Sequence, residues 1–281
     1  MNVTTKSDAM ETPSSEESDS AEKQESLASF GLFLVKLLLA VLIFRSFIFS
    51  PFSIPSESML PRLWNGDYLL ASKWSYGFSK YSLPGSAPLI PGRILASQPD
   101  RGDLVIFKHP IDQKDYIKRA IALPGDTIGV VGGQIVLNGE LISREPIAEF
   151  DIPVSTNTPC AWGADSIDNA QGVPVCRYRQ FRETLPEGRS YNVLDFGLTQ
   201  ADSFSEVTVP EGRMFVMGDN RDNSQDSRFR AIAGGGVGMV PQELLVGKAS
   251  IVMWSTDGSA EWIKPWTWFT AARWNRIGET L

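Results

Sequence analysis

Histidine and cysteine are scarce in this chain of 281 residues, and each shortage excludes a class of site. The one histidine is His109, so a Ser-His-Asp protease would have to use it, and a metal site with two histidines is impossible. The two cysteines, Cys160 and Cys176, are too few for a disulfide scaffold or a four-thiolate zinc site. If the protein hydrolyses amides, its general base is therefore His109 or a residue of another type.

The chain also has no excess of positive charge. The net charge is −7, and the stretch 1–28 alone carries −5, with seven acids against two lysines. The remainder, at −2, gives no electrostatic case for nucleic acid as a partner. Because the acidic stretch has too little apolar surface to offset its ordering entropy, we expect residues 1–28 to form a disordered tail.

One long apolar run follows this tail. Residues 28–49 read ASFGLFLVKLLLAVLIFRSFIF. Lys36 and Arg45 are the only charged residues in this run. About 20 apolar residues match the thickness of a bilayer core, and off-centre basic side chains can extend to the interface. A cleaved signal peptide would need a basic start and a small-residue cleavage site, whereas this run is preceded by acids and followed by SPFSIPS. An uncleaved transmembrane helix over 29–49 is the better interpretation, and charge alone does not orient it.

Beyond residue 50 the pattern changes to short apolar runs separated by Gly, Pro and Asn. No long stretch there keeps a helical apolar period, which predicts a mostly antiparallel β fold. Asn138-Gly139 between two apolar runs indicates a type I′ hairpin, while residues 155–206 look irregular. Strands are predicted over 67–72, 103–108, 116–123, 127–131, 134–137, 207–209, 214–217 and 248–254.

Three further segments carry chemically useful side chains. They are PFSIPSESMLP at 51–61, DYIKRAIALPGD at 115–126 and GDNRDNSQDSR at 218–228. Each alone could be an ordinary polar turn, an exposed Lys-Arg pair or a loop closed by local ion pairs. Taken together, in this order and spacing, they resemble the bacterial type I signal peptidases. The resemblance runs from about residue 47 to the C-terminus and is weak only across roughly 132–207.

The resemblance implies a set of catalytic roles. Ser58 matches the nucleophile and Lys118 the general base. Ser56 matches the hydroxyl that completes an oxyanion hole with the Ser58 N–H, and Ser224 the hydroxyl that orients the lysine. It also implies charged residues that support the site and apolar residues that line pockets for small substrate side chains. The charged set is Arg119, Asp219, Asp226 and Arg228, and the apolar set is Phe52, Ile54, Leu63, Ile106 and Ile117.

The residue types alone also support a serine nucleophile with a lysine base. A serine hydroxyl is a weak nucleophile until a neighbour takes its proton, and lysine can do so only when neutral. Burial disfavours the ammonium and can lower a lysine pKa by up to about 3–5 units. Lys118 has the apolar sequence neighbours that such burial needs. His109, followed by Pro110 and outside any Ser-His motif, is expected to be a surface or turn residue.

The resemblance implies an organisation for the whole chain. We expect a disordered acidic cytoplasmic tail at 1–28, a transmembrane helix at 29–49, a coiled antiparallel β-sheet catalytic domain at 50–131 and 208–281, and an inserted β subdomain at 132–207. The protein would be a monomeric, single-pass protein of the bacterial inner membrane, with its catalytic domain on the periplasmic side. It would cleave preprotein signal peptides without a metal or other cofactor, and the lipid bilayer would be its other partner.

Several alternatives stay open. A self-cleaving Ser-Lys protease like the SOS-response repressors would need no membrane span, and a non-enzymatic membrane-anchored β module that binds translocated proteins would not need Ser58, Lys118 and Ser224 together. Cys160 and Cys176 can form a disulfide in an oxidising compartment or stay reduced. The aromatic residues near the C-terminus can pack in the core or contact the bilayer. These residues are Trp262, Trp266, Trp268 and Phe269.

Overall fold

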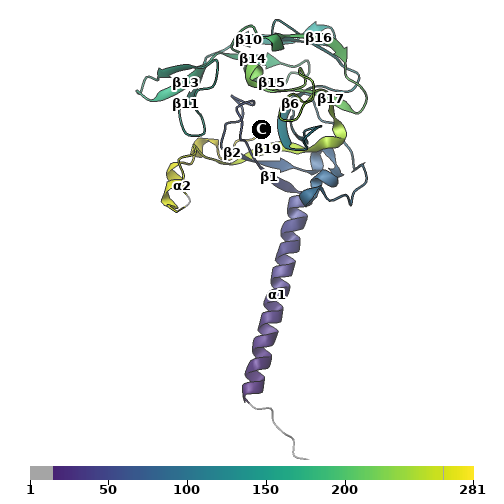
Figure 1. The fold of residues 1–281 in the computed structure, drawn as a ribbon, viewed down its shortest axis with the longest axis vertical. Coiled ribbons are helices and arrows are strands. Elements are labelled where there is room, and N and C mark those ends of the chain that lie inside the picture. The colour runs from purple at the N-terminus through teal and green to yellow at the C-terminus, as the bar shows by residue number, and fades with distance from the viewer. Residues whose placement is uncertain (1–14, 262) are drawn as a thin grey trace, which may run out of the picture. The chain divides into compact units, whose positions relative to one another are not determined.

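The computed structural model describes residues 15–261 and 263–281. It divides into two compact units, Met1–Phe44 and Arg45–Leu281. The described part of the first unit is helical, and the regular structure of the second is mostly short strands joined by turns and loops (Figure 1).

Helix α1 runs from Ser15 to Phe47. Its segment Ala28–Phe47 has a mean hydropathy of 2.2 and is, within the described residues, the one helix long and apolar enough to cross a membrane. The helix therefore begins well before the span predicted at 29–49. Residues 15–28, predicted to be disordered, are helical, and the sequence there is rich in Glu, Ala, Gln and Lys, which favour helices. Residues 1–14 of the predicted tail lie outside the described residues.

After α1, the described residues form nineteen strands, a short C-terminal helix and seven single-turn 3-10 helices. The strands of the largest sheet are β1 (Phe49–Ser53), β2 (Asp67–Ser72), β5 (Leu104–Lys108), β6 (Asp115–Ala122), β17 (Arg213–Met217), β18 (Val240–Pro241) and β19 (Leu245–Ser255). The others are β3 (Phe78–Ser79), β4 (Arg93–Ile94), β7 (Thr127–Val131), β8 (Gln134–Leu137), β9 (Glu140–Leu141), β10 (Ser143–Pro146), β11 (Phe150–Pro153), β12 (Asp165–Asp168), β13 (Pro174–Tyr178), β14 (Gln180–Thr184), β15 (Ser190–Leu194) and β16 (Ser203–Thr208). Helix α2 is Trp266–Thr270.

The largest sheet carries the site. Its strand order is β1-β2-β19-β5-β6-β17-β18, and every pairing in it is antiparallel. Strands β5 and β6 have mostly buried side chains, because each face of the sheet packs on its own apolar cluster. The mostly β prediction is confirmed, with one N-terminal apolar helix and a curled antiparallel sheet.

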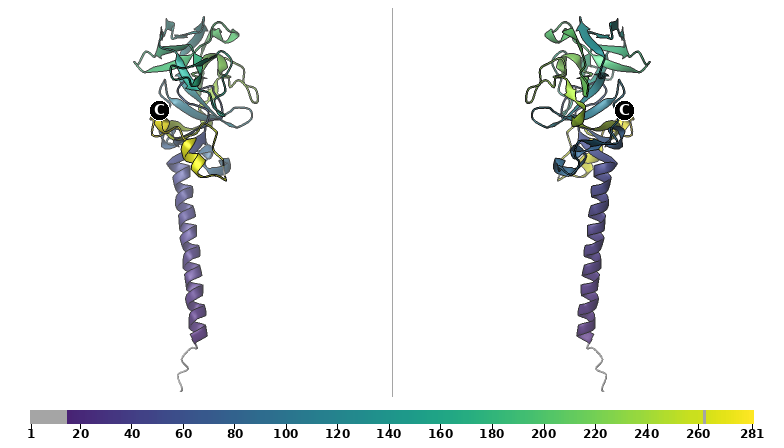
Figure 2. Two further views of the ribbon diagram at one scale, coloured as in Figure 1. Left: turned by 90° about the vertical axis from the view of Figure 1, so that its left-hand side faces the viewer. Right: turned by 90° about the vertical axis from the view of Figure 1, so that its right-hand side faces the viewer.

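A second group of strands comes from the middle of the sequence. Sheets β10-β14-β15, β11-β13-β12 and β16-β7-β8-β9 gather at the opposite end of this unit from β1 (Figures 1 and 2). The stretch 155–206, predicted to be irregular, therefore contains four regular strands, β12 to β15. They are four or five residues long, and their polar side chains hide the apolar alternation that marks longer strands.

The structure also shows the predicted hairpin turn and the state of the two cysteines. Asn138 and Gly139 both have positive φ values, 53° and 82°, as a type I′ turn between β8 and β9 requires. Cys160 and Cys176 form a disulfide beside the buried side chains of Ile152 and Tyr178. Of the two alternatives for the cysteines, the structure therefore has the bonded pair.

The C-terminal aromatic residues lie on the surface. Trp266 and Phe269 of α2 are 65% and 66% exposed, and the neighbouring Ile263 is 85% exposed. Trp268 is 40% exposed, so packing in the core is the wrong interpretation for Trp266, Trp268 and Phe269, whereas Trp262 lies outside the described residues. Within the second unit, α2 lies at the same end as β1 (Figures 1 and 2).

Candidate active site

Ser58 lies in a tight turn shortly after β1. The turn closes through the Leu60 N–H, which donates to the Glu57 carbonyl at 3.0 Å. Two bonds from Asn220 hold this turn from outside: its backbone N–H donates to the Ser58 carbonyl at 3.1 Å, and its Nδ2 donates to the Glu57 carbonyl at 3.1 Å. The backbone of Ser58 is thus fixed by main-chain and amide contacts, which leaves its hydroxyl available for chemistry.

Lys118 approaches the same hydroxyl from β6. Its side chain is 3% exposed, and its Nζ donates to Ser58 Oγ at 2.5 Å. Burial lowers the pKa of Lys118 to about 8, with Arg228 acting in the same direction and Asp226 and Asp219 opposing it. An amine with this pKa is neutral in about a tenth of the molecules at pH 7 and in about half of them at pH 8, and the neutral form can accept the serine proton.

The loop 218–228 packs directly against the serine. A Cβ at Gly218 would lie 2.5 Å from the Ser58 carbonyl oxygen and 2.2 Å from Ser224 Oγ, so only glycine fits at this approach. The Gly218 N–H donates to Asp226 Oδ2 at 3.0 Å, and the same carboxylate accepts from Arg228 Nε at 2.9 Å. Since these donors satisfy Asp226, it does not form an ion pair with Lys118.

The other predicted ion pair is equally well formed. Arg119 Nε donates to Asp219 Oδ1 at 2.7 Å, and the guanidinium also donates to the Gly102 carbonyl at 2.7 Å. Adjacent residues on a strand point to opposite faces, so Lys118 faces the serine while Arg119 faces away from it. The four charged residues predicted to support the site thus form two buried pairs, Arg119–Asp219 and Arg228–Asp226.

A third buried pair was not predicted. Arg221 donates to both oxygens of Glu183 on β14, each at 2.5 Å, and both side chains are almost fully buried. Arg221 Nε also donates to the Gly218 carbonyl at 3.2 Å. Arg221 was visible within the loop motif, but Glu183 lies 38 residues away in the poorly matching middle region. Asn220, which fixes the Ser58 backbone, is likewise in the motif and was given no role.

A groove of about 390 Å³ opens beside Ser58 and Lys118. Four of the five predicted pocket residues line it: Phe52, Ile54, Ile106 and Ile117. The fifth, Leu63, does not reach it. Leu63 is completely buried in the core with Met59 and Leu69, because the turn after Ser58 directs it inward.

The two supporting hydroxyls have different surroundings. Ser56 Oγ lies 3.5 Å from Ser58 Oγ and lines the groove, as an oxyanion donor must. Ser224 Oγ is buried and has no hydrogen-bond partner among the described residues. The hydrogen bond expected between Ser224 and Lys118 is therefore not formed here, and the orienting role of Ser224 stays a prediction.

His109 does not line the catalytic groove, although its ring packs against Tyr116, which does. It is completely buried, which contradicts the surface position expected for it, although it does lie in a turn. Its Nδ1 accepts from the Ile111 and Asp112 N–H groups, and its Nε2 lies 3.2 Å from the Gly236 carbonyl. The ring thus holds the turn through Nδ1 and contacts the separate loop at Gly236 through Nε2.

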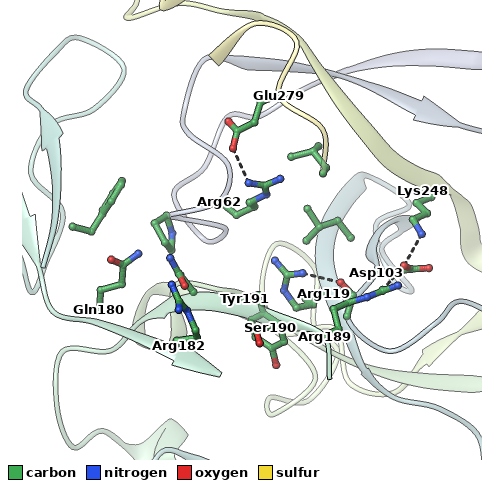
Figure 3. Close-up of a pocket in the computed structure, with 16 residues that line it drawn as sticks. Arg62, Asp103, Arg119, Gln180, Arg182, Arg189, Ser190, Tyr191, Lys248 and Glu279 are labelled. Carbon is green, nitrogen blue, oxygen red and sulfur yellow. Dashed lines mark hydrogen bonds and ion pairs between the residues drawn. The ribbon is translucent and has the colours of Figure 1, made fainter. Parts of the chain in front are cut away.

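A larger cavity of about 800 Å³ lies on the Arg119 side of β6 (Figure 3). Neither Ser58 nor Lys118 lines it. Figure 3 shows several of its charged side chains in ion pairs: Arg62 with Glu279, and both Arg189 and Lys248 with Asp103. No group of three His, Cys, Asp or Glu residues in the described part of the chain could hold a metal ion. The catalytic geometry is therefore confined to the smaller groove.

Comparison with known proteins gives a consistent result. The family model described as signal peptidase, peptidase S26, matches residues 27–254. Signal peptidase I of Rickettsia typhi is 37% identical over 244 residues, covering 83% of this chain and 81% of the relative. For that of Rickettsia conorii the identity is 34% over 275 residues, covering 90% and 92%. A crystal structure of a signal peptidase I from Enterococcus faecalis is 26% identical and covers 55% of this chain and 98% of that one, with a TM-score of 0.30.

The assignment rests on the family model and on the two sequence relatives. The model covers most of the chain, including the serine turn, β6 and the loop 218–228. Both relatives exceed 30% identity over more than four fifths of their own length. On these grounds the chain belongs to the signal peptidase family, peptidase S26, and is a serine peptidase.

Proposed function

We propose that this protein removes N-terminal signal peptides from exported preproteins, with Ser58 as nucleophile and Lys118 as general base. The observation that carries the proposal is the contact between Lys118 Nζ and Ser58 Oγ, 2.5 Å apart at the end of a groove. Neutral Lys118 takes the hydroxyl proton as Ser58 Oγ attacks the scissile carbonyl. The tetrahedral intermediate then collapses to an acyl-enzyme, and the departing amine takes the proton from Lys118. Neutral Lys118 then takes a proton from a water molecule, which attacks the Ser58 ester and hydrolyses it.

The negative oxygen of the intermediate needs donors that are already in place. The Ser58 N–H donates to no acceptor among the described residues, and the Ser56 hydroxyl lines the same groove. Two such donors, held before the reaction starts, stabilise the developing charge by roughly 3–4 kcal/mol each. This assignment follows the roles that the resemblance implies.

An extended peptide fits the groove. Strand β17 pairs with β6 only from Arg119 onward, so the segment 115–118 pairs with β5 on one side and is free on the other. A substrate strand can therefore pair with this edge, its alternate side chains pointing into the groove. Branched and aromatic walls at Ile54, Ile106 and Phe52 leave room for small side chains, which favours residues such as alanine at the first and third positions before the cut.

The location follows from the same set of features. Helix α1 and the signal peptidase relatives fit a single-pass membrane protein. We propose that it lies in the bacterial inner membrane, with its tail in the cytoplasm and its catalytic domain on the outer side. The Cys160–Cys176 disulfide supports an oxidising compartment for that domain. The exposed Trp266 and Phe269 would contact the bilayer surface. We further propose that the protein acts as a monomer without a cofactor.

Trapping of the acyl-enzyme tests this mechanism. The full chain in detergent is incubated with hydroxylamine and a preprotein. This preprotein has alanine at the first and third positions before the cut. We expect part of the released signal peptide to carry a C-terminal hydroxamate, because hydroxylamine attacks the Ser58 ester in competition with water. Mass spectrometry of the peptide is the measurement.

Two controls define the result. The Ser58→Ala variant should release no peptide, and a preprotein with leucine at the first position should remain uncut. Release of signal peptide that carries only a free carboxylate, at hydroxylamine concentrations that trap a known serine acyl-enzyme, would contradict the proposed intermediate.

A further inference from the structure

A second cavity, of about 450 Å³, lies beside the catalytic groove and is rich in basic side chains. Arg45, Lys73 and Lys108 line it, against the single acid Asp115. We call it the Lys73 cavity. The proposed protease chemistry uses none of its basic groups.

Lys73 is the unusual member of this group. Its side chain is only 3% exposed, yet no carboxylate of the described residues lies within ion-pair distance of its ammonium group. One hydrogen bond is formed, from Nζ to the Tyr81 carbonyl at 3.3 Å, and Nζ lies 5.7 Å from the centre of the Phe52 ring. An ammonium group has three donors, and buried charges are normally paired. The cavity therefore holds a buried cation that is only partly compensated.

The remaining charges do not supply the missing anion. Asp115 lies 2.9 Å from Lys108 Nζ and is paired there. Burial is the main reason that the pKa of Lys73 falls to about 8, and Lys108, Arg45 and Arg93 lower it further, against the opposing effect of Asp115. An anion in the cavity would offset both the burial and the repulsion between the cations.

The residues that line the cavity follow closely after the membrane-spanning segment in the sequence, and this indicates the source of that anion. Arg45 lies in the last turn of α1, and the apolar segment that can span a membrane ends at Phe47. Ser50, which lines the cavity, follows three residues later, at most about 10 Å of extended chain. The headgroup layer of a bilayer is about 5–8 Å thick on each side. Chain connectivity alone therefore keeps the cavity close to the lipid headgroups.

We propose that the Lys73 cavity binds the phosphate group of an anionic phospholipid from the adjoining leaflet. The ammonium of Lys73 would approach the phosphate directly, Arg45 would approach it from the end of the span, and the hydroxyls of Ser53 and Ser86 are further donors in the wall. The site adjoins the catalytic groove, because both share Phe52, Ser53 and Asp115. The proposal does not depend on the Ser58–Lys118 chemistry.

Native mass spectrometry of the full chain in detergent tests the proposal. The protein is mixed with equal amounts of phosphatidylglycerol, which is anionic, and phosphatidylcholine, which is zwitterionic. We expect bound phosphatidylglycerol to exceed bound phosphatidylcholine by on the order of five-fold for each basic residue that contacts the headgroup. Lys73→Met should reduce this preference about five-fold, and Arg45→Gln should also reduce it. Lys73→Arg should retain it.

Lys80→Met is the matched control, because Lys80 is an exposed lysine nearby that does not line the cavity. It should keep the full preference. Equal binding of the two lipids by the wild type, or a preference that persists in Lys73→Met, would overturn the proposal. The wild-type comparison and Lys73→Arg decide the matter even if Lys73→Met does not fold.

Two other occupants give different outcomes. If inorganic phosphate binds the wild type and displaces phosphatidylglycerol at millimolar concentration, the cavity is a site for free phosphate and the lipid assignment is wrong. If Lys73→Met slows preprotein cleavage in phosphatidylcholine micelles while the lipid preference stays intact, Lys73 belongs to the peptide-binding surface, and the lipid assignment is again wrong.

Discussion

Lys118→Met is expected to lower kcat/KM for preprotein cleavage by at least about 10⁴-fold, because methionine cannot accept the Ser58 proton. Ser58→Ala should cause a loss of the same order. The double variant should lose little more than either single one, since groups that act in one step are not additive. The Lys118→Met protein should fold, because the site is buried and methionine removes a charge that burial disfavours.

The measurement is the rate of preprotein cleavage, with the thermal unfolding temperature as a check on folding. Lys80→Met, which changes an exposed lysine outside the groove, should cleave at the wild-type rate. A Lys118→Met variant that retains activity within tenfold of the wild type would show that another group is the base.

Arg221→Met should be the most damaging change to stability among the charged residues near the site. It leaves the fully buried carboxylate of Glu183 without its partner and breaks a connection between the loop 218–228 and β14. Removing one member of a buried pair typically costs about 3–5 kcal/mol, because the other charge stays buried and unpaired. We expect a loss of this size in the free energy of unfolding, measured by denaturant titration, together with slower cleavage because the loop also holds Ser58.

Two controls separate the burial of the charge from the loss of a contact. The double variant Arg221→Met/Glu183→Leu should recover much of the lost stability, since neither remaining side chain is charged. Arg177→Met breaks a similar two-bond pair with Asp151 that is partly exposed, so solvent screening should make its cost in stability much smaller than that of Arg221→Met. Equal losses in Arg221→Met and Arg177→Met would contradict the role assigned to burial.

The sequence was most informative where several local signals agreed. Strands β2, β7 and β8 were predicted to the residue, because apolar runs there are bounded by turn residues. Ser58 and Lys118 lie in motifs whose order and spacing define the site, and the structure brings them into contact. The single histidine had already limited the general base to His109 or a residue of another type.

Other features depend on tertiary packing that no local pattern contains. Leu63 was placed in the groove because a motif position matched, but the turn after Ser58 directs it into the core. His109 was expected at the surface or in a turn; it does lie in a turn, but its ring is buried, and Nδ1 accepts from the backbone of that turn. Glu183 gave no signal, since its partner Arg221 lies on a loop far along the chain.

The pH dependence of kcat/KM tests the central claim most directly, because this quantity reports the protonation state of the free enzyme. Lys118 has a pKa of about 8 and is active only when neutral, so kcat/KM should fall about tenfold per pH unit below that value and level off above it. A profile that stays flat from about pH 6 to about pH 9 would mean that no group with the assigned pKa controls the reaction, and would contradict a neutral Lys118 as the base.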